Sequence, residues 1–80
     1  MSKREIAEAI KESKAKAAAY ALFLKNHRGS KVLRIEECVH FALPIDEVII
    51  DFLSAYTRMR FRYMYDWRTE ETQVSEKSIR

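Results

Sequence analysis

Residues 58–68 read RMRFRYMYDWR, and the fold prediction depends on how this stretch is interpreted. Apolar side chains occupy most odd positions and arginines most even ones, a period of two that is typical of a β-strand. The same stretch also continues a helical stripe, made by Tyr56, Met59, Tyr63 and Trp67. A lone strand without a hairpin signal would have no neighbour to pair with in so short a chain. We therefore expect a helix here, with a strand as the alternative.

The segments before this stretch also predict helices. Residues 3–27 repeat apolar side chains at spacings of three, four or seven, which indicates a long first helix that ends at Gly29. Ser30 can cap a short second helix over residues 31–43. Pro44 ends that helix and can begin a third, because proline is tolerated in the first helical turn.

These segments predict an all-α fold with a single domain. Residues 1–68 would form three helices, the long first and third antiparallel and the short middle one between them. One glycine and one proline in 80 residues also argue against a β-rich fold, which needs turn residues at short intervals. The polar residues 69–80 show no apolar stripe and are predicted to be a frayed tail.

The size and composition predict a cytoplasmic protein that associates with itself. Cys38 is the only cysteine, so no disulfide can form within the chain and a reducing compartment fits best. No stretch approaches the roughly 20 apolar residues of a membrane span, and the first residues lack a signal peptide's apolar region. A core this small cannot bury all of the aromatic residues near the end of the chain, which favours a homodimer or a partner protein.

Charge is distributed in three blocks along the chain. Residues 1–31 carry eight basic and three acidic side chains, residues 32–57 one basic and five acidic, and residues 58–68 four basic and one acidic. Such a pattern bears on how partners are attracted and not on the fold.

The residues that could carry chemistry do not predict an enzyme. Cys38 and His40 are two positions apart, which on a helix places them on different faces and rules out a shared metal. Cys38 is expected to be a small buried thiol, and no nucleophile, metal or phosphate-binding motif is present. The pairs Glu36–Glu37 and Asp46–Glu47 would diverge on a helix and form no acid–base dyad. We therefore expect no catalytic residue, metal, cofactor or small-molecule substrate.

The alternating stretch is the candidate partner-binding site. Arginine mixed with aromatic residues is typical of protein interfaces and also of single-stranded nucleic-acid binding. The alternative is that the rings pack in the core while the arginines extend into water. The predicted partner-binding residues are Arg58, Arg60, Arg62, Tyr63, Tyr65, Trp67 and Arg68. A secondary basic face is predicted from Lys11, Lys14, Lys25, Arg28 and Lys31, most simply as a solvated helix surface.

The sequence thus predicts a small regulatory or adaptor protein that acts by binding another protein or itself. Short basic chains without motifs are often bacterial or phage regulators. The alternative is a small basic nucleic-acid-binding protein, of single-strand-binding or helix-turn-helix type. Against the second type, the would-be recognition helix begins with Asp46 and Glu47, whose carboxylates would face phosphates.

Overall fold

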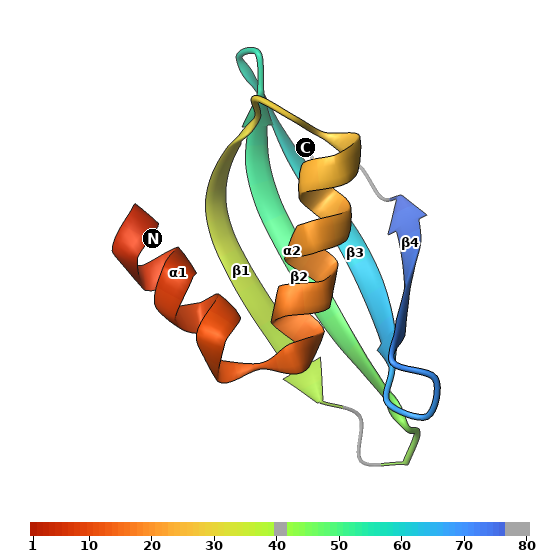
Figure 1. Cartoon of the computed structure of the whole chain (residues 1–80). Helices are drawn as coiled ribbons and strands as arrows, with labels where there is room; N and C mark the ends of the chain where they lie inside the picture. Colours follow the sequence, from red (N-terminus) through yellow and green to blue (C-terminus); the bar gives the residue numbers. More distant parts are fainter. Residues whose placement is uncertain (40–41, 77–80) are drawn as a thin grey trace.

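A single helix layer covers one face of an antiparallel β-sheet (Figure 1). The computed structural model describes residues 1–39 and 42–76. The elements in this part of the chain are α1 (Lys3–Glu12), α2 (Lys14–Asn26), β1 (Lys31–Val39), β2 (Ile45–Ser54), β3 (Thr57–Asp66) and β4 (Glu71–Glu76). The strands lie in the order β1-β2-β3-β4, and each is antiparallel to the next.

The expected all-α bundle of three helices is therefore wrong. The chain is an α+β protein in which residues 31–39, predicted as a helix, form β1. The predicted third helix is instead the hairpin of β2 and β3. Only the first predicted helix is helical, and it is interrupted.

Two serines set the boundaries of the helices. Ser2 caps α1 in a capping box, in which its hydroxyl accepts from the Glu5 N–H at 3.2 Å and the Glu5 carboxylate accepts from the Ser2 N–H at 3.1 Å. Ser13 is extended, with φ −143°, so it ends α1. Its hydroxyl then accepts from the Lys16 N–H at 3.3 Å and caps α2. The long predicted helix is thus broken at a residue that stabilises the start of the next one.

Side chains of β2 and β3 alternate between the two faces of the sheet, and those on one face are buried. Even-numbered residues of β2 from Asp46 to Phe52 are buried, as are Phe61, Tyr63 and Tyr65 of β3. Ser54 pairs with Thr57, so the loop consists of Ala55 and Tyr56. Ala55 adopts φ +56°, a left-handed conformation that normally favours glycine or asparagine. The hairpin therefore lacks the sequence signal that identifies most tight turns.

The two outer strands of this sheet are β1, where a helix was predicted, and β4, where a frayed tail was predicted. β1 pairs with β2 and contains an irregularity between Val32 and Arg34. Along its outer side, the Met1 amino group donates to the Leu33 carbonyl at 2.9 Å. β4 pairs with β3 over part of the predicted frayed tail, while residues 77–80 lie outside the described residues.

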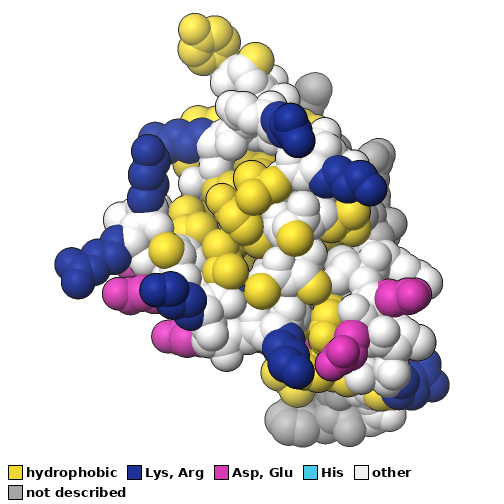
Figure 2. Space-filling view, in the orientation of Figure 1, with side chains coloured by type: hydrophobic (Ala, Val, Ile, Leu, Met, Phe, Trp, Pro, Cys, Tyr) yellow, Lys and Arg dark blue, Asp and Glu magenta, His cyan; other side chains and the backbone are white. Residues whose placement is uncertain are grey.

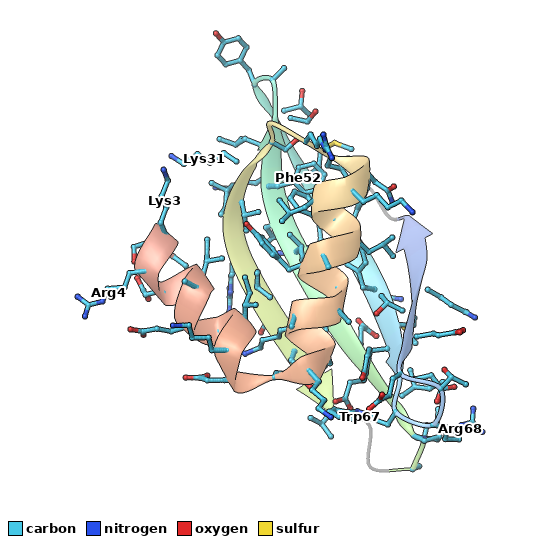
Figure 3. All side chains as sticks on the ribbon, viewed as in Figure 1. Lys3, Arg4, Lys31, Phe52, Trp67 and Arg68 are labelled. Carbon is cyan, nitrogen blue, oxygen red and sulfur yellow. The ribbon has the colours of Figure 1, made fainter. Side chains whose placement is uncertain are left out.

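The core lies between α2 and the sheet. Ala15 and Ala19 of α2 are fully buried, and their small side chains allow the helix to lie close to the strands. Phe23 follows one turn later and meets Phe52 edge-on, with ring centroids 4.8 Å apart. Figure 3 shows Phe52 beneath the second half of α2. The alanine-rich segment thus packs against a sheet.

Neither α1 nor α2, the helices of the described residues, is long and apolar enough to cross a membrane. Sheet and helices instead bury apolar residues against one another.

The left-handed turn makes a testable prediction. Ala55→Gly should raise the free energy of unfolding by up to about 1 kcal/mol, because glycine adopts φ +56° without a Cβ clash. Ala21→Gly, on the exposed side of α2, is the matched control and should lower it by about 0.5–1 kcal/mol. Urea denaturation measures both. Equal destabilisation by the two substitutions would contradict the turn geometry.

Candidate functional site

The helices leave the other face of the sheet uncovered, and we call this surface the open face. Its residues alternate along the strands with the buried ones. By strand register, the open face comprises Lys31, Arg34, Glu36 and Cys38 of β1, Ile45, Glu47, Ile49, Asp51 and Leu53 of β2, Arg58, Arg60, Arg62, Met64 and Asp66 of β3, and Glu71 and Gln73 of β4.

Two of the predicted arginines are held by acidic residues of β2. Arg60 lies directly opposite Asp51, and its Nε and Nη2 donate to the two carboxylate oxygens at 2.7 and 3.3 Å. These hydrogen bonds and the negative charge of Asp51 raise the pKa of Arg60 above its ordinary value. Arg62 pairs with Glu47, with Nε 3.0 Å from Oε1. About 40% of each arginine side chain is still exposed, so both pairs border solvent.

Arg58 differs from these two. It is exposed and lies opposite Leu53, and no acidic side chain of the described residues forms an ion pair with it. Arg68 lies beyond β3 and folds back onto Asp66, with Nη2 2.9 Å from Oδ2. Its hydrogen bonds lower the pKa of Asp66 to about 2. Arg58 is therefore the arginine of this stretch that keeps its charge available for a partner.

The aromatic residues of the predicted site are not on the open face. Tyr63 and Tyr65 are buried under α2, with 0% and 2% exposure, so the structure does not bring them together with the arginines. Trp67 follows β3 and is 43% exposed. The predicted site thus divides into core tyrosines, open-face arginines and a separate tryptophan.

Trp67 belongs to a cluster that sequence reasoning missed. Its Nε1 donates to Oδ2 of Asp46 at 2.7 Å, and Asp46 is only 5% exposed. The side chain of Glu37, on the neighbouring strand, is hydrogen-bonded to Asp46. Burial is the main cause that raises the pKa of Glu37, followed by this hydrogen bond, while Ser13 and Lys16 act in the opposite direction. Two carboxyl groups from different strands, Glu37 of β1 and Asp46 of β2, are therefore in contact. The sequence pointed only to pairs of adjacent acidic residues and did not predict this contact.

The predicted secondary basic face is not one surface. Lys11 lies at the end of α1, and Lys14, at the start of α2, is 3.6 Å from a Glu70 carboxylate oxygen. Lys25 lies in the last turn of α2, and Arg28 and Lys31 follow it. The five cations are therefore divided between the two ends of α2, as Figure 2 shows for the basic side chains scattered over the helical side.

The remaining chemistry-bearing side chains lie apart from one another. Cys38 is exposed, which corrects the expectation of a buried thiol. His27 packs against Phe61 with ring centroids 4.6 Å apart, on the helix side of the sheet. His40 lies outside the described residues. Among the described residues, no group of three histidine, cysteine or acidic side chains is placed to hold a metal ion.

No family model, curated protein or solved structure matches this chain. Function is therefore inferred from the chain's own geometry.

The Glu37–Asp46 contact predicts a specific pH dependence. Because the pKa of Glu37 is higher in the folded protein than its ordinary 4.5, the folded state binds this proton more tightly. The stability that the folded state gains from protonated Glu37 is present below pH 4.5 and is lost as the pH rises through the raised pKa. Glu37→Gln, which cannot ionise, should therefore gain thermal stability relative to wild type between pH 4 and pH 7. An equal difference in melting temperature at both pH values would contradict this.

Proposed function

We propose that this chain is a small non-enzymatic binding protein that docks the open face of its sheet on another protein. The observation that carries the proposal is the apolar centre of that face. Ile49 and Met64 lie there half-buried on neighbouring strands, and the half-buried Leu53 lies toward the end of the face where Arg58 is; neither α1 nor α2 covers these residues. Charged side chains surround this centre, as at protein interfaces with an apolar core and a polar rim.

The charge of the open face favours a protein partner over nucleic acid. Among its described residues, four arginines and one lysine are balanced by five carboxylates. Two of those arginines are already bound to Asp51 and Glu47. Affinity for nucleic acid comes mainly from unneutralised cations against phosphates, which this balance does not provide.

The layout of these charges indicates what the partner must present. Arg58 lies at one end of β3, while Asp66 and, beside it, Glu71 lie at the other. A complementary surface therefore carries acidic groups at one end and basic groups at the other, with apolar side chains between. A second copy of the chain meets this requirement when a two-fold axis runs across the strands, because that rotation places Arg58 over the acidic end. We therefore infer that the first partner is the chain itself.

The cytosol fits this function. Cys38 is an exposed thiol on the open face, and a reducing compartment would keep it from forming disulfides with other molecules.

Sedimentation analysis tests self-association through this face. Wild-type protein should dimerise at micromolar concentrations, and Ile49→Asp should weaken the dimer by at least about tenfold, because it buries a carboxylate at the apolar centre of the open face. Leu24→Asp is the matched control, since Leu24 is a part-exposed leucine on α2 and its substitution should leave association unchanged. Circular dichroism and melting curves confirm that both variants fold.

Two results would contradict parts of this proposal. A wild-type protein that stays monomeric would exclude the second copy as partner. The open face would still be supported if a partner purified from the host bound wild type and the Leu24→Asp variant but not Ile49→Asp. Strong binding to random DNA or RNA that weakens steeply with salt would instead favour the nucleic-acid function and refute the protein-binding one.

A further inference from the structure

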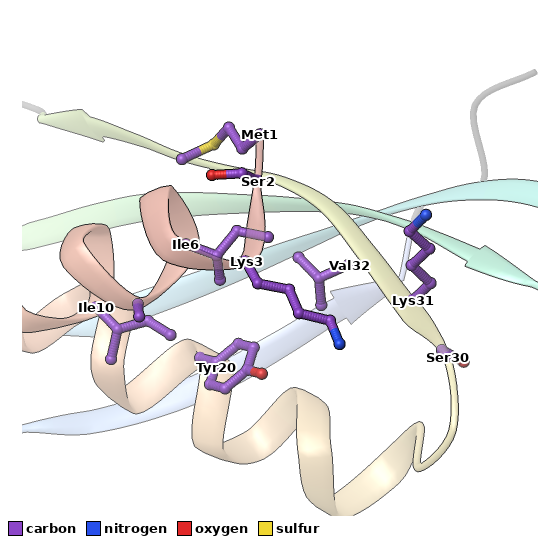
Figure 4. Close-up of a pocket in the computed structure, with 10 residues that line it drawn as sticks. Met1, Ser2, Lys3, Ile6, Ile10, Tyr20, Ser30, Lys31 and Val32 are labelled. Atoms are coloured by element: carbon purple, nitrogen blue, oxygen red, sulfur yellow. The ribbon is translucent and has the colours of Figure 1, made fainter.

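A separate cleft lies on the helical side of the molecule, between α1, the first half of α2 and the start of β1 (Figure 4). Its volume is about 610 Å³, within the range of small-molecule sites. It is lined by Met1, Ser2, Lys3, Ile6, Ala7, Ile10, Tyr20, Ser30, Lys31 and Val32. The open face is on the opposite side of the sheet, so this cleft is independent of the proposed function.

The floor of the cleft is apolar and continuous with the core. Ile6 belongs to the core and is 7% exposed. Ile10, Tyr20 and Val32 pack against the core but are only partly buried, and all three line the cleft. In the space-filling view of the same side, hydrophobic side chains gather in a hollow between the helices (Figure 2). An apolar ligand would remove the remaining exposed surface of these residues from water.

The charged side chains that line the cleft are both lysines. Lys3 and Lys31 come from the starts of α1 and β1, and in the close-up their ammonium ends lie apart, that of Lys31 on the other side of β1 (Figure 4). In the close-up, Lys3 extends across the cleft toward Tyr20 and Val32 (Figure 4).

These lysines are not neutralised by acids of the described residues. No ion pair involves Lys3 or Lys31 in this part of the chain. The acids of the first half of α1 have other partners. The Glu5 carboxylate accepts from the Ser2 N–H, and the Glu8 carboxylate lies 3.6 Å from Nε of Arg4. The cleft thus combines an apolar floor with the positive charge of Lys3.

We propose that this cleft binds a small free carboxylic acid with a straight apolar chain. The chain would lie on Ile6, Ile10 and Val32, and the carboxylate would be held by the ammonium group of Lys3, which extends across the cleft. A carboxylate fits because ammonium groups form strong, charge-assisted hydrogen bonds with it. The ligand is bound and not chemically changed, so the site adds a ligand-binding function to a protein that also docks on other proteins.

Titration with octanoate, followed by amide NMR spectra of the labelled protein, tests this site. 1-Octanol has the same chain without the charge and is the matched ligand. Octanoate should shift amides around the cleft saturably and bind at least about tenfold more tightly than octanol, since hydrogen bonds to charged groups are the stronger kind. Equal affinities, or shifts that cluster away from the cleft, would overturn the proposal.

Variants separate the two halves of the site. Lys3→Gln should weaken octanoate binding by about tenfold and leave octanol binding unchanged. Lys11→Gln, on α1 but outside the cleft, is the control and should bind octanoate like wild type. Ala7→Phe, at an exposed position that lines the cleft, should abolish binding of both ligands by filling the space. Undiminished octanoate binding by either cleft variant would refute the proposal.

Discussion

The edge-on contact between Phe23 of α2 and Phe52 of β2, with ring centroids 4.8 Å apart, joins the helix layer to the sheet. Phe61 extends this contact to β3, since its ring lies 5.1 Å from that of Phe52. The contact is possible because Ala15 and Ala19 bring α2 close to the strands over the preceding turns. A larger side chain at either alanine would lift the helix and separate the rings, and close-packed interiors tolerate such insertions poorly.

Covering one face of the sheet determines what the other face can do. β3 supplies Tyr63 and Tyr65 to the core and, from the alternate positions, Arg60 and Arg62 to the open face. The core and the open face therefore both draw on the residues of β3. Ion pairs with Asp51 and Glu47 of β2 hold Arg60 and Arg62 in place, whereas Arg58 lies opposite Leu53.

Part of this structure can be predicted from the sequence. The period of two in residues 58–68 indicates a strand correctly, and the shared face of their arginines follows from it. The neighbouring β2 hides its alternation, because Ile49 and Leu53 on the open face are as apolar as Ile50 and Phe52 in the core. Because β2 is not recognisable as a strand from its sequence, residues 58–68 have no evident partner strand, and the sequence favours a helix there. The contact of Glu37 with Asp46 depends on strand register, so no pattern within one segment could indicate it. The cleft likewise requires three elements to come together.

Positive φ angles at Ala55 and Glu70, in the two loops that flank β3, have a consequence for how the chain folds. A loop whose residues resist the conformation that the turn requires contributes little to starting a hairpin. The strands then come together only when contacts distant in sequence, above all those of α2 with β2 and β3, compensate for the ordering of the chain. A hairpin of this kind has little stability on its own. Sheet and helix layer would therefore form in a single cooperative step.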